Sequence, residues 1–214
     1  MHIEVLVEDS SGRRLLDILL PQVLGPYGQP HTWRVISYKG IGRIPKALNP
    51  KADPAKRILL DRLRQVLPGL GRTTGIDAVV VVLDVEKRDC KAFLKDLLAL
   101  AETCNPQPKT MFRLAIEEME AWYLGDKEAL LGAYPRAKRH VLGGYVQDSA
   151  CDTWELLAEA LHPGGSAAIK KAGWPLRGQI KHEWAERIGP RMTMDQNDSP
   201  SFGKFRDGLR RLIA

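Results

Sequence analysis

The feature that most constrains the fold is an unbroken apolar run, AVVVVL at Ala78–Leu83, which ends in acidic residues. Four consecutive valines without alternation are typical of a strand that is buried on both faces, as at the centre of a parallel sheet. Asp84, Glu86 and Asp89 follow this run. Because ligands of open α/β sheets bind outside the carboxyl ends of the strands, these carboxylates lie where a site is expected.

Strand-like and helix-like segments alternate through the first half of the chain. Apolar positions at helical spacing separate the predicted strands, which are His2–Val7, Thr32–Ser37, the valine run and Thr110–Ile116. This order predicts an α/β fold with a parallel, right-handed, Rossmann-like sheet that has helices on both faces. The helix before the valine run is predicted to begin at Asp53-Pro54 and to end at Pro68-Gly69.

The pattern changes at about residue 126, after which helices and turns predominate. We therefore expect an α/β domain over residues 1–125 and a helical extension over residues 126–214 that packs on it. The helices predicted in the extension are Asp152–Leu161, Gln179–Ile188 and Ser201–Ile213.

The composition limits the class of protein but does not identify a function. A formal net charge of +6, from 32 basic and 26 acidic residues, is compatible with a nucleic-acid partner. The cysteines are odd in number and far apart, and the five histidines are scattered, so a disulfide framework or a zinc site has little support. No segment resembles a signal peptide or reaches the roughly 20 apolar residues of a membrane span. We expect a cytoplasmic protein that does not contact a membrane.

Two predicted strands end in acid, which indicates a metal site. Glu8 and Asp9 follow the first strand, as Asp84 and Glu86 follow the valine run. Hard cations such as Mg²⁺ or Mn²⁺ take oxygen ligands, commonly one or two carboxylates with waters and phosphate oxygens. We predict a metal site made of Glu8, Asp84 and Glu86. Within this site Glu8 is either a ligand of the ion or a general base or acid. For Asp89 we favour a helix cap.

The opening segment, VLVEDSSGRRLLDILL, also resembles a response-regulator receiver, in which an acidic pair after the first strand binds magnesium. A receiver carries its phosphoacceptor aspartate after the third strand, much sooner in the chain than Asp84. The long segment Tyr38–Lys51 and the second acid at Glu86 also fit a receiver poorly.

Glu8 followed by Asp84-Val85-Glu86 resembles the Toprim domain of topoisomerases, primases and the overcoming-lysogenization-defect (OLD) nucleases. IEEMEAWYLGD at Ile116–Asp126 and NDSPSFGKF at Asn197–Phe205 are similar to a bacterial family catalogued as domain of unknown function number 4276. The resemblance implies a Toprim-like fold, metal-dependent phosphodiester chemistry and pairing with an ATPase in defence-type or toxin-type gene neighbourhoods. Toprim usually has glycine where this chain has Asp9, and aspartate where it has Glu86.

Three glutamates lie where the fourth strand meets a helix, namely Glu117, Glu118 and Glu120. Negative charge in a first helical turn stabilises the helix by roughly 0.3–1 kcal/mol, which is a sufficient structural reason for these residues. In the resembled family the glutamate before Ala-Trp belongs to the signature, so Glu120 is predicted as an additional catalytic residue. Trp122 is expected in the core.

Basic residues are the candidates for nucleic-acid binding. Arginine in a first helical turn opposes the helix dipole, so an anion there would be stabilising. The predicted phosphate contacts are Arg13 and Arg14 in the first helix and Lys39, Arg43 and Lys46 in the loop after the second strand. The helical tail adds a further basic set, Lys170, Lys171, Arg177, Lys181, Arg187 and Arg191. No Walker loop is present, so ATP hydrolysis by this chain is not expected.

Two functions are consistent with these features. The first is a Mg²⁺-dependent nuclease that cleaves DNA or RNA together with a partner ATPase. The second is a non-catalytic module with a degenerate Toprim fold that binds nucleic acid or the ATPase, for which Asp9 and Glu86 are the evidence. The sequence also leaves self-association open.

Overall fold

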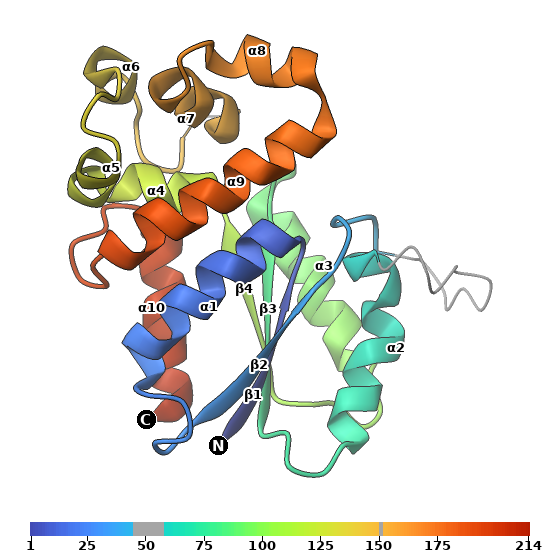
Figure 1. The fold of residues 1–214 in the computed structure, drawn as a ribbon. Coiled ribbons are helices and arrows are strands. Elements are labelled where there is room, and N and C mark those ends of the chain that lie inside the picture. Colours follow the sequence, from blue (N-terminus) through green and yellow to red (C-terminus); the bar gives the residue numbers. More distant parts are fainter. Residues whose placement is uncertain (45–57, 150–151) are drawn as a thin grey trace.

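The computed structural model describes residues 1–44, 58–149 and 152–214, and their centre is a four-stranded sheet (Figure 1). All strand pairs are parallel, in the order β2-β1-β3-β4. The strands are β1 (His2–Val7), β2 (Thr32–Ser37), β3 (Ala78–Asp84) and β4 (Thr110–Ala115). The predicted Rossmann-like α/β fold is confirmed, and the fourth strand ends one residue earlier than predicted.

The valine run of β3 is buried because the sheet is covered on both faces. Val80 and Val82 pack in one apolar cluster with α1 (Ser10–Leu24), whereas Val79 and Val81 pack in a second cluster with α2 (Leu59–Arg72) and α3 (Cys90–Glu102). Alternate side chains of a strand point to opposite faces, so a strand between two helical layers needs an apolar residue at every position.

The helix boundaries follow local chemistry with one exception. Asp89 caps α3 as predicted, because its side chain accepts a hydrogen bond from the Ala92 N–H at 2.7 Å. Asp9 caps α1 in the same way, because its side chain accepts from the Gly12 N–H at 2.7 Å. The predicted end of α2 at Pro68-Gly69 is wrong, since the helix runs on to Arg72.

The physical reason for the longer α2 is packing beyond the proline. Leu70 packs against the cluster that α2 shares with α3 and the sheet. Proline removes one backbone hydrogen bond from a helix, and burial of apolar side chains on both sides of it offsets this loss. The predicted start of this helix, at Asp53-Pro54, lies outside the described residues.

The helices that follow β4 in the sequence pack into the same apolar cluster as β1, β3 and α1. Helix α9 packs against α1, and α10 packs against β4 (Figure 1). The predicted helices of the extension are observed as α7, α9 and α10, with α9 starting five residues earlier than expected. The elements are α4 (Glu120–Gly125), α5 (Lys127–Ala133), α6 (Arg139–Gly143), α7 (Thr153–Leu161), α8 (Gly165–Ala172), α9 (Trp174–Ile188), a 3₁₀ turn (Gly189–Arg191) and α10 (Pro200–Ile213).

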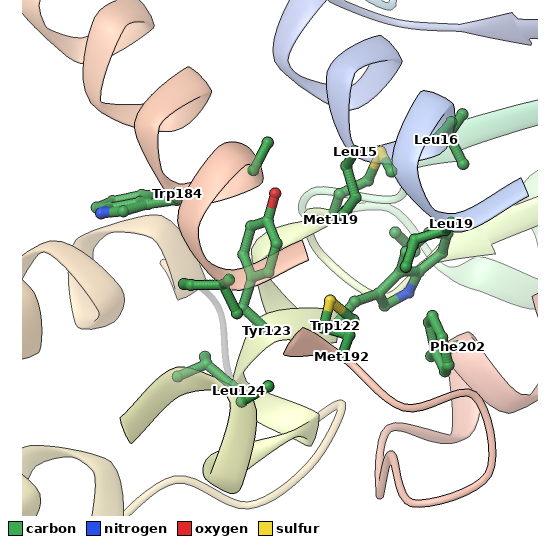
Figure 2. Packing of buried hydrophobic residues seen from close by; sticks show 14 of the residues in the cluster. Leu15, Leu16, Leu19, Met119, Trp122, Tyr123, Leu124, Trp184, Met192 and Phe202 are labelled. Atoms are coloured by element: carbon green, nitrogen blue, oxygen red, sulfur yellow. The ribbon is translucent and has the colours of Figure 1, made fainter. Parts of the chain in front are cut away.

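Trp122 lies at the centre of this core, as predicted (Figure 2). Its ring stacks on that of Phe205 at 4.9 Å between centroids, and its indole N–H donates to Ser201 Oγ at 3.1 Å. Asn197 donates to the Trp122 carbonyl at 2.8 Å. The two segments that carried the family resemblance therefore pack against each other, although about 70 residues separate them in the sequence.

In the part of the chain that the structure describes, no helix combines the length and the apolar character needed to cross a bilayer.

Candidate functional site

The site lies at the carboxyl edge of the two central strands. β1 and β3 are adjacent and parallel, with Val7 opposite Val82, so Glu8 and Asp84 both lie at the carboxyl edge of the sheet. Both residues line a small cavity of about 10 Å³, which is room for about one water-sized species. Both also line a larger cleft of about 610 Å³. The structure thus brings these two predicted residues together.

Glu8 is held close to the sheet and lacks a full set of partners. Its carbonyl accepts a hydrogen bond from the Gly40 N–H at 3.1 Å, which fixes the backbone. Its side-chain Oε2 is buried and has no hydrogen-bond partner among the described residues. Burial raises the pKa of Glu8 to about 7, and the negative charges of Asp9 and Glu86 add to this increase.

Asp84 is the deeper of the two carboxylates. Its Oδ1 accepts a hydrogen bond from the Met119 N–H at 3.0 Å. Burial raises the pKa of Asp84 well above its usual range, and the nearby charge of Glu8 raises it further. A carboxyl group whose ionisation is disfavoured by desolvation and by a neighbouring carboxylate is a common feature of functional sites, and a bound cation would stabilise both groups as anions.

Glu86 is directed away from Asp84. In an extended chain residues 84 and 86 would share one side of the strand, but Glu86 has φ 52°, outside the β region. Its N–H donates to the Glu117 carbonyl at 2.8 Å, and its side chain pairs with Arg88 at 2.9 Å. Glu86 lines the cleft, but its carboxylate is half-exposed and directed to an arginine because the chain leaves the strand at Asp84.

A buried lysine lies among the acidic residues. Lys181, on α9, is 8% exposed, and its Nζ lies 3.1 Å from Glu120 Oε1 and 3.8 Å from Glu118 Oε1. Burial lowers the pKa of Lys181, but the surrounding carboxylates outweigh burial and raise the pKa above its ordinary value. The sequence grouped Lys181 with the other basic residues of the helical tail, and the structure places it among the acidic residues that line the cleft. Glu120, predicted as a site residue, is 4% exposed and lines the small cavity.

Glu117 and Glu118 serve a helix other than the one that follows them. Glu117 accepts hydrogen bonds from the backbone N–H groups of Asp152 and Thr153, the latter at 2.7 Å. Glu118 accepts from the Trp154 N–H at 3.2 Å, so the two carboxylates cap the start of α7. Burial, followed by the charge of Glu120, raises the pKa of Glu118 to about 8. No sequence pattern within one segment predicts such a cap.

The predicted basic residues are dispersed. Lys39 lines the cleft. Arg13 pairs with Asp17 at 3.6 Å and Arg14 with Glu186 at 3.2 Å, so carboxylates of the protein partly neutralise both. The backbone N–H of Arg43 donates a hydrogen bond to the Asp61 side chain at 3.1 Å.

Lys46 lies outside the described residues. From the basic tail, Arg177 joins Lys39 and Lys181 in lining the cleft. The sequence did not distinguish these two tail residues from the other basic residues around them.

The donor set fits a cation that keeps part of its water shell. Within residues 1–44, 58–149 and 152–214, no group of three or more His, Cys, Asp or Glu side chains is placed as a complete metal centre. Mg²⁺ is commonly held by one or two carboxylates, with waters and substrate phosphates as the other ligands. Glu8 and Asp84 supply two such carboxylates, and the unpartnered Oε2 of Glu8 is an available oxygen.

Stability is expected to fall as pH rises when divalent cations are chelated. The pKa of Glu8 is raised from 4.5 to about 7 and that of Glu118 from 4.5 to about 8. The native state therefore binds these protons more tightly than the unfolded state. Their stabilising contribution is complete below the unfolded pKa and is lost as pH rises through the native pKa.

Urea unfolding of the wild type and of Glu8→Gln between about pH 5 and pH 8 tests this linkage. The free energy of unfolding of the wild type should decrease relative to that of the variant over this range. If the free energy of unfolding of the wild type minus that of the variant stays constant, or increases with pH, the assigned direction of the Glu8 pKa shift is wrong.

Comparison with known proteins identifies one family. The model of the family described as "Domain of unknown function (DUF4276)" matches residues 7–210, which is nearly the whole chain and agrees with the resemblance noted above. No curated protein and no solved structure matches the sequence.

Proposed function

Because the chain belongs to the DUF4276 family, a family without a defined activity, we propose its function from the site: a Mg²⁺-dependent nuclease that hydrolyses phosphodiester bonds in DNA or RNA. One observation carries the proposal. Two partly buried and incompletely compensated carboxylates, Glu8 and Asp84, line a cleft to which Lys39, Arg177 and Lys181 contribute positive charge. Carboxylates suit a metal ion and cations suit a phosphate, and the cleft provides both.

Glu8 and Asp84 would hold the metal, with Glu86 at the cleft wall. A bound Mg²⁺ or Mn²⁺ supplies Lewis-acid polarisation of the phosphate and a water of lowered pKa. Lys181 and Arg177 are placed to stabilise negative charge on the substrate. This reading agrees with the Toprim resemblance, which we retain as part of the proposal.

Metal binding is expected to stabilise the wild type. A cation that binds between Glu8 and Asp84 binds the native state only, so Mg²⁺ or Mn²⁺ should raise the melting temperature. Asp84→Ala removes one ligand and should abolish the increase. Thermal shift measurements over a metal titration test this prediction, with Asp96→Ala, an exposed aspartate on α3, as the matched control. An equal increase in wild type and Asp84→Ala would rule out this metal site.

The direct test of activity is a cleavage assay. Purified protein is incubated with plasmid, single-stranded DNA and tRNA in Mg²⁺ or Mn²⁺, with and without chelator. Metal-dependent cleavage that requires Asp84 would support the proposal. From the resemblance alone we also propose that the chain acts with a partner ATPase in a defence-type or toxin-type system. We further propose that copies of this chain self-associate.

The second candidate is a non-catalytic module that binds nucleic acid or the ATPase. Two observations favour it: Lys181 already pairs with Glu120, and Glu86 pairs with Arg88. Both pairs supply positive charge that a catalytic cation would otherwise supply. Nucleic-acid binding without cleavage, in every metal tested, would favour this module over the nuclease.

A further inference from the structure

A tryptophan at the cleft is exposed, which is unusual for so large an apolar side chain. Trp174 is the first residue of α9, it is 69% exposed, and it lines the same cleft as Glu8 and Asp84. A tryptophan side chain has 150–250 Å² that can be buried, so leaving it in water forgoes a large stabilisation. Among the other tryptophans, Trp122, Trp154 and Trp184 are buried.

An arginine connects Trp174 to the protein interior. The guanidinium of Arg177 lies 4.0 Å from the ring centroid of buried Trp154 and 5.2 Å from that of Trp174. Arg177 also pairs with Glu118 at 3.6 Å, and its Nε is buried without a hydrogen-bond partner among the described residues. The arginine is therefore anchored by a buried ring and a buried carboxylate, and it supports the exposed indole beside it.

The cleft combines an aromatic surface, cations and an acidic centre. Trp174, Arg177 and Lys39 line it together with Glu8 and Asp84. Every nucleobase has a π-face that stacks on an aromatic side chain, and the adjoining phosphates pair with lysine and arginine. In a duplex both faces of a base are covered by its neighbours, so an indole in a cleft discriminates in favour of unpaired nucleotides.

We infer that the cleft binds single-stranded nucleic acid, with an unpaired base stacked on Trp174 and its phosphate near Lys39 and Arg177. This inference rests on the proposed function, because it places the strand beside the acidic residues that would cleave it. It also assigns the substrate class, namely single strands or the unpaired segments of folded RNA.

The test is the affinity of a fluorescently labelled single strand and of its duplex, measured by anisotropy with Mg²⁺ and with chelator. Trp174→Ala should weaken single-strand binding roughly tenfold or more, and Trp174→Phe, which retains a ring, should preserve most of it. Tyr27→Ala is the matched control: Tyr27 is 62% exposed but precedes β2, on the amino side of the sheet. It should bind as the wild type does.

Intrinsic fluorescence gives a second measurement. A base stacked on the indole should quench the emission of Trp174, and Trp174→Phe should lose this quenching although it still binds. The inference is overturned if the wild type does not bind the single strand, if Trp174→Ala binds it as tightly as the wild type, or if this variant loses duplex and single-strand affinity equally.

The two proposals fail in different ways. Single-strand binding that requires Trp174, without cleavage in any metal, would leave this inference standing and remove the nuclease. Cleavage that requires Glu8 and Asp84, with single-strand affinity unchanged in Trp174→Ala, would support the nuclease and overturn this inference.

Discussion

Glu8→Gln and Asp84→Asn are each expected to lower Mg²⁺-dependent cleavage by roughly a hundredfold or more while the protein stays folded. Each substitution keeps the size of the side chain and removes its charge. The two residues come from adjacent strands and line one cavity, so the proposed chemistry uses both at one site. Because residues that act as a unit are not additive, the double variant should be hardly slower than either single variant.

The measurement is the initial rate of cleavage of the best substrate under saturating metal. Matched controls lie on α3, where Glu102→Gln and Asp96→Asn change exposed carboxylates that line neither the cavity nor the cleft. These controls should cleave at the wild-type rate. Should Glu8→Gln and Asp84→Asn retain that rate as well, the activity comes from another site and the nuclease proposal for this cleft is wrong.

Lys181→Met is expected to destabilise the protein by about 3–5 kcal/mol, because it leaves buried carboxylates without their counter-charge. Lys181 is almost fully buried and pairs with Glu120 and Glu118. Its charge also acts on Glu8 and Asp84, in both cases lowering the carboxyl pKa. Urea unfolding at constant pH, with metal chelated, gives the difference in the free energy of unfolding.

A double variant separates charge from packing in this prediction. Lys181→Met combined with Glu120→Gln removes both members of the closest pair, and it should recover part of the stability lost in Lys181→Met. Lys171→Met, an exposed lysine on α8, is the control and should change stability little. If Lys181→Met loses no more stability than Lys171→Met, then Lys181 does not compensate the charges of Glu118 and Glu120.

Much of the architecture could be predicted because it depends on local patterns. The all-apolar β3 indicated a strand with helices on both faces, and the alternation of strands and helices indicated a parallel sheet. Asp89 after the strand indicated the cap of α3. Trp122 in the core followed from its apolar character and its place in a helix. These features need little information from distant parts of the chain.

The structure brings the predicted site residues together where strand geometry decides their position, and it directs them apart where the chain leaves the strand. Glu8 follows β1 and Asp84 is the last residue of β3, and parallel neighbours bring such positions together. Glu86 is two residues further, where a left-handed backbone turns its carboxylate toward Arg88. Asp9, read as a departure from the Toprim pattern, has a structural use as the cap of α1.

The sequence by itself determined the strands, their parallel direction and the acidic strand ends, because residue periodicity, polarity and the alternation of strands with helices fix these. Only the tertiary structure decided which of many basic and aromatic residues reach the cleft. Lys181, Arg177 and Trp174 are distributed among other lysines, arginines and tryptophans of the helical tail. The packing of α9 against α1 brings these three residues to the sheet edge. That packing depends on contacts between segments more than 150 residues apart, which no local pattern encodes.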